Sequence, residues 1–127
     1  MKPTTAFAAI AVSALCVSTR AHAADLDKLK LLFVGDPGTP RAQHFAGFLK
    51  ENVGHVEIAA RRSFKPEQAD EFEVVLLDWP QSETTREEWL QPRAPLGERK
   101  AWTKPTVLLG SAGLNLAVVW KVRGGSG

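Results

Sequence analysis

Three short polar turns, each directly after an apolar run, hold the side chains that could do chemistry. They contribute Asp36, Asp78 and Ser111. A carboxylate in such a turn could act as a general acid or base, or could bind a polar ligand. Aspartate is also common where a strand ends in a turn, because its side chain accepts hydrogen bonds from nearby backbone amides. For Asp36 and Asp78, the binding interpretation and the turn-forming interpretation both stay open.

The third turn has the sequence Gly110-Ser111-Ala112-Gly113 and precedes an apolar segment. If that segment is a helix, the free backbone amides at its start could hold a carboxylate, phosphate or oxyanion. The same small residues also suit a tight strand-to-helix turn. The turn lacks the G-x-S-x-G spacing of a nucleophile elbow and the Gly-Lys-Ser/Thr of a phosphate loop. It therefore predicts amide donors rather than a catalytic serine.

Trp79 directly follows Asp78 and could stack on a sugar ring or a cofactor, although most tryptophans of a small domain pack in its core. A metal site needs three or four converging ligands, and only His44, Asp36 and Asp78 qualify. We therefore predict no metal site and no cofactor, and we assign no catalytic residue. The predicted ligand-binding residues are Asp36, Asp78, Trp79, Gly110, Ser111 and Gly113.

Four apolar runs predict the strands that position these turns. They are residues 28–34, 55–60, 72–77 and 105–109. Near-continuous apolar strands that alternate with helical segments are typical of a parallel sheet in an α/β domain. Ligands of such a sheet bind beyond the carboxyl ends of the strands, which is where the three turns fall.

Helical segments are predicted between these strands. Thr39 and Pro40 suit the N-cap and first position of a helix over residues 41–53, and Gly54 favours its end. A short helical turn over residues 65–70, a short helix over 85–90 and an apolar helix over 114–122 follow. The pattern predicts a flavodoxin-like three-layer sandwich, with helices on both faces of a small, mostly parallel sheet of about four strands. One edge of so small a sheet is exposed, which favours a homo-oligomer or a partner domain there.

Residues 1–23 have the pattern of a secretory signal peptide. A lysine gives the positive start, residues 6–17 (AFAAIAVSALCV) give the apolar run, and residues 21–23 (AHA) give a small-x-small cleavage site. An uncleaved membrane anchor and a lipoprotein acylated at Cys16 are the alternatives. We expect export to the periplasm or the outside of the cell, cleavage after Ala23, and only transient membrane contact through the signal peptide.

Charge and cysteine content exclude several classes of function. The chain has a net charge of +2, from 16 basic and 14 acidic residues. Two basic residues, Lys2 and Arg20, lie in the leader, which has no acidic residue, so the remainder of the chain is balanced. A balanced chain gives no reason to expect nucleic-acid binding, and the pair Arg61-Arg62 carries little weight. The one cysteine, Cys16, also lies in the leader, so the remainder can form neither a disulfide nor a cysteine-based site.

The length of 127 residues allows one domain. We assign residues 1–23 to the signal peptide and residues 24–127 to a single α/β domain. The segment 124–127 (GGSG) follows the last helix with nothing after it, and we expect a truncated C-terminus rather than a glycine-rich tail.

Most of residues 30–125 resembles the ThuA-like (trehalose-utilisation) family of the class I glutamine-amidotransferase-like fold. The similar stretches are residues 31–38 (LLFVGDPG), 64–78 (FKPEQADEFEVVLLD), 107–112 (VLLGSA) and 120–125 (WKVRGG). That family has a histidine where this chain has Gly110, and no cysteine replaces it as a nucleophile. The resemblance therefore implies the fold and a loose link to sugar metabolism, and it implies no particular reaction.

These observations lead to three hypotheses of function, each from a different class. The first is an exported α/β domain that binds a small polar, carbohydrate-type ligand at the carboxyl edge of the sheet. The second is the N-terminal part of a sugar-active hydrolase or isomerase whose catalytic residues lie beyond Gly127. The third is a protein-interaction module that docks through the exposed sheet edge or the apolar last helix.

Overall fold

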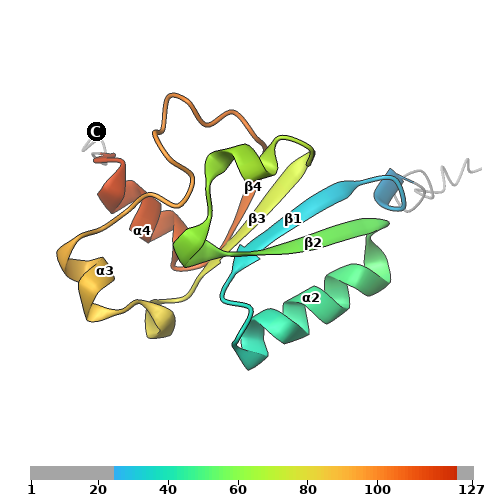
Figure 1. The fold of residues 1–127 in the computed structure, drawn as a ribbon, viewed down its shortest axis with the longest axis horizontal. Coiled ribbons are helices and arrows are strands. Elements are labelled where there is room, and N and C mark those ends of the chain that lie inside the picture. The colour runs from blue at the N-terminus through green and yellow to red at the C-terminus, as the bar shows by residue number, and fades with distance from the viewer. Residues whose placement is uncertain (1–24, 123–127) are drawn as a thin grey trace, which may run out of the picture.

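The computed structural model describes residues 25–122, which form a four-stranded sheet with helices on both sides (Figure 1). The strand order is β2-β1-β3-β4, and each pairing is parallel. The strands are β1 (Lys30–Gly35), β2 (His55–Ala60), β3 (Val74–Trp79) and β4 (Thr106–Gly110). The helices are α2 (Pro40–Asn52), α3 (Arg86–Leu90) and α4 (Ala112–Val119), with 3-10 turns η1 (Arg61–Ser63), η2 (Pro66–Ala69) and η3 (Gln81–Glu83). The predicted small α/β sandwich of flavodoxin-like type is confirmed.

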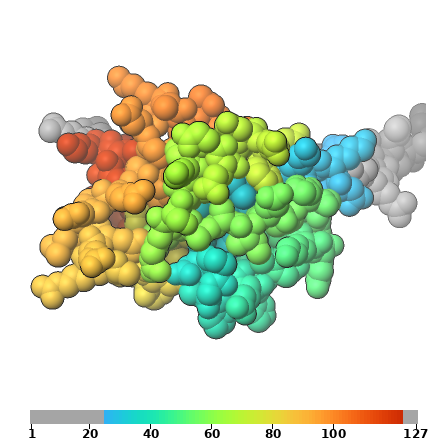
Figure 2. All heavy atoms as spheres, in the orientation of Figure 1, coloured from blue at the N-terminus to red at the C-terminus, as the bar shows by residue number. Residues whose placement is uncertain are grey.

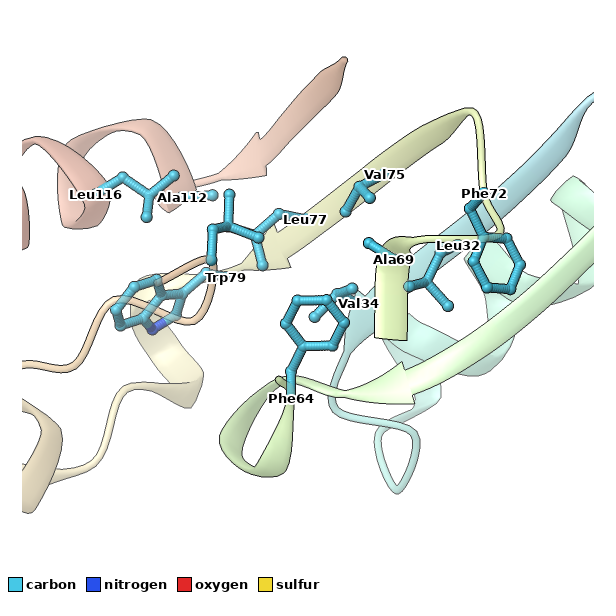
Figure 3. Packing of buried hydrophobic residues seen from close by; sticks show 11 residues of the cluster. Leu32, Val34, Phe64, Ala69, Phe72, Val75, Leu77, Trp79, Ala112 and Leu116 are labelled. Atoms are coloured by element: carbon cyan, nitrogen blue, oxygen red, sulfur yellow. The ribbon is translucent and has the colours of Figure 1, made fainter. Parts of the chain in front are cut away.

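The two faces of the sheet are covered by different elements. Helix α2 packs on one face, where its Ala42 and Leu49 form a buried cluster with Leu31 and Phe33 of β1. The larger cluster lies on the other face, where Figure 3 shows side chains from β1 and β3 beside those of α4 and the η1–η2 region. Its buried members are Leu32, Val34, Phe64, Ala69, Phe72, Val75, Leu77, Trp79, Leu96, Ala112 and Leu116. Alternate residues of one strand therefore pack on opposite faces of the sheet.

Helix α2 begins where the sequence predicts. The Thr39 hydroxyl accepts a hydrogen bond from the Ala42 amide at 3.2 Å, and Pro40 is the first helical residue. Gly54 follows the helix, but it is not the left-handed helix end that the sequence predicts, because its φ is not positive. A Cβ atom at Gly54 would lie 1.6 Å from the backbone oxygen of Asp27. The glycine is needed where the chain returns beside the segment that precedes β1.

The strand predictions agree for β2 and are shifted for β3. Strand β2 spans the predicted residues 55–60. The sequence predicts the third strand over residues 72–77, but β3 is two residues further along, so Asp78 and Trp79 are its last residues rather than part of the turn. Pairing explains the shift, since β3 begins its register with β1 at Val74 and ends opposite Gly110 of β4.

Helix α4 starts and ends earlier than predicted. The sequence predicts residues 114–122, whereas the helix spans Ala112–Val119. Gly110, with a φ of +62°, turns the chain sharply at the end of β4, and Ser111 is already the N-cap. Ala112 is fully buried against the sheet, so the helix must begin there to pack.

Two predictions fall outside the described residues. They are the signal peptide over residues 1–23 and the truncated end at residues 124–127. Within residues 25–122, every helix is too short or too polar to cross a membrane.

Candidate functional site

The strand order creates a topological switch point between β1 and β3. From β1 the chain passes to β2 on one side, and it then crosses back to β3 and β4 on the other side. Ligands of open α/β sheets bind at the carboxyl ends of the strands beside such a point. Asp36 directly follows β1, and Asp78 lies one residue before the end of β3. Two of the predicted site residues therefore flank the switch point.

Asp78 is buried, with 1% of its surface exposed, and Arg41 from the first turn of α2 holds it. The Arg41 Nε atom lies 2.9 Å from Oδ2 and 3.1 Å from Oδ1, and Nη2 lies 3.0 Å from Oδ1. This is a forked, charge-assisted contact. The hydrogen bond to Asp78 raises the pKa of Arg41 above its ordinary value, against a smaller opposing effect of burial. In this arrangement Asp78 fixes α2 to β3.

Trp79 points to the opposite face of the sheet from Asp78, because consecutive strand residues alternate. Only 3% of Trp79 is exposed, and the guanidinium carbon of Arg61 lies 4.7 Å from the centre of its ring. Figure 3 shows the indole within the larger cluster, beside Leu77. This burial leaves the ring without the open face that the predicted stacking on a sugar requires.

Arg62 connects the segments that follow three different strands. It lies in η1 after β2, and its Nη1 donates to Oδ2 of Asp36, after β1, at 2.9 Å. Its Nη2 donates to the backbone oxygen of Glu83, after β3, at 3.0 Å. The carboxyl edge is therefore held together by ion pairs and hydrogen bonds, and Asp36 is one of the partners.

Arg61 is the neighbour of Arg62 but points inward, and only 3% of it is exposed. Its Nη1 donates to the Glu88 carboxylate of α3. Its Nε and Nη2 atoms are buried and have no acceptor among the described residues, and the same holds for Nε1 of Trp79 beside it. Buried donors are nearly always paired, because an unmet donor reduces stability. Arg61 and Trp79 therefore form an unusual pair of unsatisfied neighbours.

The short helix α3 positions Glu88. The Thr85 hydroxyl accepts from the Glu88 amide at 3.2 Å, and the Glu88 carboxylate accepts from the Thr85 amide at 2.8 Å. This reciprocal pair is a capping box. Burial raises the pKa of Glu88, but hydrogen bonds from Arg61 and Thr85 and the charges of Arg61 and Arg62 outweigh burial, so the pKa lies below its ordinary value. Glu88 is therefore ionised at neutral pH.

A pocket of about 420 Å³ lies between η1 and α3. In Figure 2 the yellow-orange α3 segment lies against the green segment that follows β2. Phe64 and Pro95 are its apolar lining residues. Its polar lining residues are Arg61, Arg62, Thr85, Glu87, Glu88, Gln91 and Arg93. The lining thus combines hydrogen-bond donors and acceptors with apolar surface.

The turn from Gly110 to Gly113 lies at the same edge, beside the end of β3. The Ser111 amide donates to the backbone oxygen of Trp79 at 3.1 Å, so this predicted amide donor is already used. A Cβ atom at Gly110 would lie 3.2 Å from Cα of Pro80. The Ser111 side chain forms no capping hydrogen bond. The close approach to the end of β3 and the φ of +62° account for Gly110, and ligand binding by the turn stays a prediction.

Sequence reasoning missed Arg61, Arg62 and Glu88 as site residues. One signal was present, because Arg61 and Arg62 directly follow a predicted strand and so belong to the same edge as Asp36. A second signal was the pattern from Thr85 to Glu88, which is that of a capping box. No local pattern indicates that α3 folds back beside η1, and that contact builds the pocket.

His44, the one histidine considered as a metal ligand, is exposed on α2 beside Phe45 and Phe48. Over residues 25–122, no group of three or more His, Cys, Asp or Glu side chains is arranged to hold a metal ion.

Comparison with protein-family models, with curated proteins and with solved structures found no match to this chain. The resemblance to the ThuA-like family therefore stays a hypothesis. The geometry of the carboxyl edge is the basis for the functional proposal that follows.

Proposed function

We propose that this chain is an exported α/β domain that binds a small polar, carbohydrate-type ligand at the carboxyl edge of its sheet. The observation that carries the proposal is the pocket between η1 and α3, which lies after β2 at this edge. Its lining pairs charged and hydrogen-bonding groups with Phe64 and Pro95. A sugar has hydroxyl groups that donate and accept and apolar C–H faces, so a lining of this kind suits it.

The predicted site residues have an indirect role in this proposal. Asp36 holds Arg62, which lines the pocket, and Asp78 holds Arg41 at the next strand. The two carboxylates thus fix the positions of the cations at the carboxyl edge. The amides of the 110–113 turn, apart from the one already bonded, complete the proposed set of polar groups.

Export and family membership are further parts of the proposal. Export rests on the signal-peptide pattern of residues 1–23. A place in the ThuA-like family is supported by the α/β fold class and agrees with a sugar ligand. The enzyme alternative, a sugar-active hydrolase or isomerase, stays a prediction.

A second candidate function is a protein-interaction module. The edge strand β4 exposes 46% of Val107 and 44% of Leu108, and Leu114 and Val118 are exposed on α4. Apolar side chains beside an unpaired strand edge favour association with another protein surface. Sedimentation velocity over a range of concentrations tests this function, and a constant monomer mass would count against self-association.

Saturation-transfer NMR of the purified chain with a panel of neutral and acidic monosaccharides tests the proposed function. We expect signals from at least one sugar, and a loss of those signals in Arg62→Gln, because Arg62 lines the pocket. The matched control is Arg99→Gln, an exposed arginine that lines a different pocket. If no sugar gives a signal, or if both variants behave alike, the proposal is wrong.

A further inference from the structure

We propose that the pocket between η1 and α3 binds an oxyanion, a carboxylate or a phosphate group, that its small polar ligand carries. The oxyanion is held by the Nε–Nη2 edge of Arg61, with Arg93 as a second cation on the pocket wall. This inference rests on the proposed function, since it names the ligand class of the same site.

The strongest support is a comparison between two arginines of the same sheet edge. Arg41 presents Nε and Nη2 to the carboxylate of Asp78, with contacts of 2.9 to 3.1 Å. In Arg61 the same two atoms have no acceptor among the described residues, and Nη1 is used by Glu88. The Nε–Nη2 edge is a planar fork that matches two oxygens of a carboxylate or a phosphate. The edge with which Arg41 binds a carboxylate is therefore unpaired in Arg61 among the described residues.

Trp79 adds a further donor at this position. Its Nε1 is buried without an acceptor among the described residues, and its ring lies against the Arg61 guanidinium. A guanidinium and an indole N–H can only donate hydrogen bonds. A group that satisfies both must therefore supply hydrogen-bond acceptors, as the oxygens of an oxyanion do.

Two carboxylates near the pocket are committed to other partners, whereas the exposed Glu87 in the lining takes part in none of the ion pairs within residues 25–122. Glu88 accepts from Arg61 and from the Thr85 amide, and its Oε2 is 3.9 Å from Nε of Arg62. Asp36 is bonded to Arg62. Arg93, by contrast, is exposed on the pocket wall and takes part in none of the ion pairs within residues 25–122. Arg93 is therefore the arginine of the lining without an ion pair among these residues, and Arg61 keeps its Nε–Nη2 edge unpaired.

The unpaired nitrogen atoms of Arg61 are shielded from water, although the residue lines the pocket. Because these atoms are buried, a neighbouring side chain of the lining must move before an oxyanion can reach them. Once there, it is bound where water competes little, so its charge-assisted hydrogen bonds are stronger than at a surface. Binding must then alter the surroundings of the Trp79 indole.

The test is an NMR titration of the ¹⁵N-labelled chain with sodium phosphate and, separately, with sodium acetate, at an ionic strength held constant with sodium chloride. We expect saturable shifts of the Trp79 indole N–H and Arg61 Nε–H signals. Arg93→Gln should weaken binding roughly tenfold, because one charge-assisted hydrogen bond is lost. Arg99→Gln should leave it unchanged. The anion that binds more tightly identifies the oxyanion as phosphate or carboxylate.

Arg61→Lys is the second variant, because it keeps the charge and removes the fork. We expect it to fold, as judged by the dispersion of its amide signals, and to lose the saturable shifts. Unchanged affinity would overturn the role of the fork.

If neither anion gives a saturable shift, or if chloride gives the same one, the inference is wrong. Neutral sugars that bind while both anions fail would leave the proposed function standing. Anions that bind while every sugar fails would retain the oxyanion site and reject the carbohydrate ligand.

Discussion

Arg41 and Arg61 illustrate how the surroundings of one residue decide between a structural role and a binding role. Arg41 is partly exposed, and its fork is filled by the buried carboxylate of Asp78. Arg61 is buried, and its fork is unpaired among the described residues. The first arginine therefore joins α2 to the sheet, while the second is the one that we propose binds the ligand.

Loss of Arg41 should destabilise the protein more than loss of the Asp78 charge. Arg41→Met leaves the buried Asp78 carboxylate without its cation, whereas Asp78→Asn leaves a partly exposed arginine that water can solvate. We expect Arg41→Met to lower the free energy of unfolding by about 2 kcal/mol, because one partner of the pair is exposed, and Asp78→Asn to cost less. Urea unfolding measures both, with Arg99→Met as an exposed control. The reverse order of the two losses would contradict this assignment.

The contribution of Glu88 should depend on pH. Its pKa in the folded protein lies below the ordinary 4.5, because its partners outweigh burial. A lowered pKa stabilises the folded state above the unfolded pKa, and this stabilisation is lost as the pH falls through the folded pKa. Glu88→Gln should therefore be less stable than the natural chain at neutral pH, with the difference shrinking below pH 4.5.

The midpoint of urea unfolding, measured from neutral to acidic pH, checks this expectation. Glu87→Gln is the matched control, since Glu87 is the exposed neighbour on the same helix. A difference between Glu88→Gln and the natural chain that stays constant with pH would contradict the assigned ion pair.

At the scale of elements, local sequence signals predict that a strand or helix is present more accurately than they predict where it begins and ends. The N-cap at Thr39 and the extent of β2 followed directly from residue types. The end of β3 could not be predicted, because Asp78 is polar and a polar residue after an apolar run favours a turn. Its burial depends on Arg41, which is 37 residues away in the sequence. Placing Asp78 inside the strand also moves Trp79 to the other face of the sheet.

Substitution by alanine should have opposite effects on stability at two glycines, one inside α2 and one just after it. Gly54→Ala should lower the free energy of unfolding by more than about 2 kcal/mol, because the new Cβ atom would collide with the backbone of Asp27. Gly47→Ala should raise it by about 0.5–1 kcal/mol, because Gly47 lies inside the helix and a Cβ atom there meets nothing within 4 Å. Thermal and urea unfolding compare the two variants. A tolerated Gly54→Ala would contradict the close approach of the two segments.

At the scale of the whole molecule, the sheet order accounts for where the polar groups meet. Parallel strands bring the ends of β1, β2 and β3 to one edge, so the sequence could predict that Asp36 and Asp78 are neighbours. The pocket could not be predicted, because it needs η1 and α3 side by side, and 22 residues separate their ends in the sequence between Ser63 and Arg86. Arg61 therefore becomes a site residue only through tertiary packing.

The most direct measurement is a map of backbone amide shifts over residues 25–122 when the chain is saturated with its best-binding sugar or anion. We expect the largest shifts in η1 and α3, with smaller ones at Asp36 and the end of β3, because these segments surround the pocket at the carboxyl edge. Largest shifts at the amino ends of the strands, near Lys30, His55 and Val74, would contradict the account. Shifts confined to β4 and α4 would favour the interaction module instead.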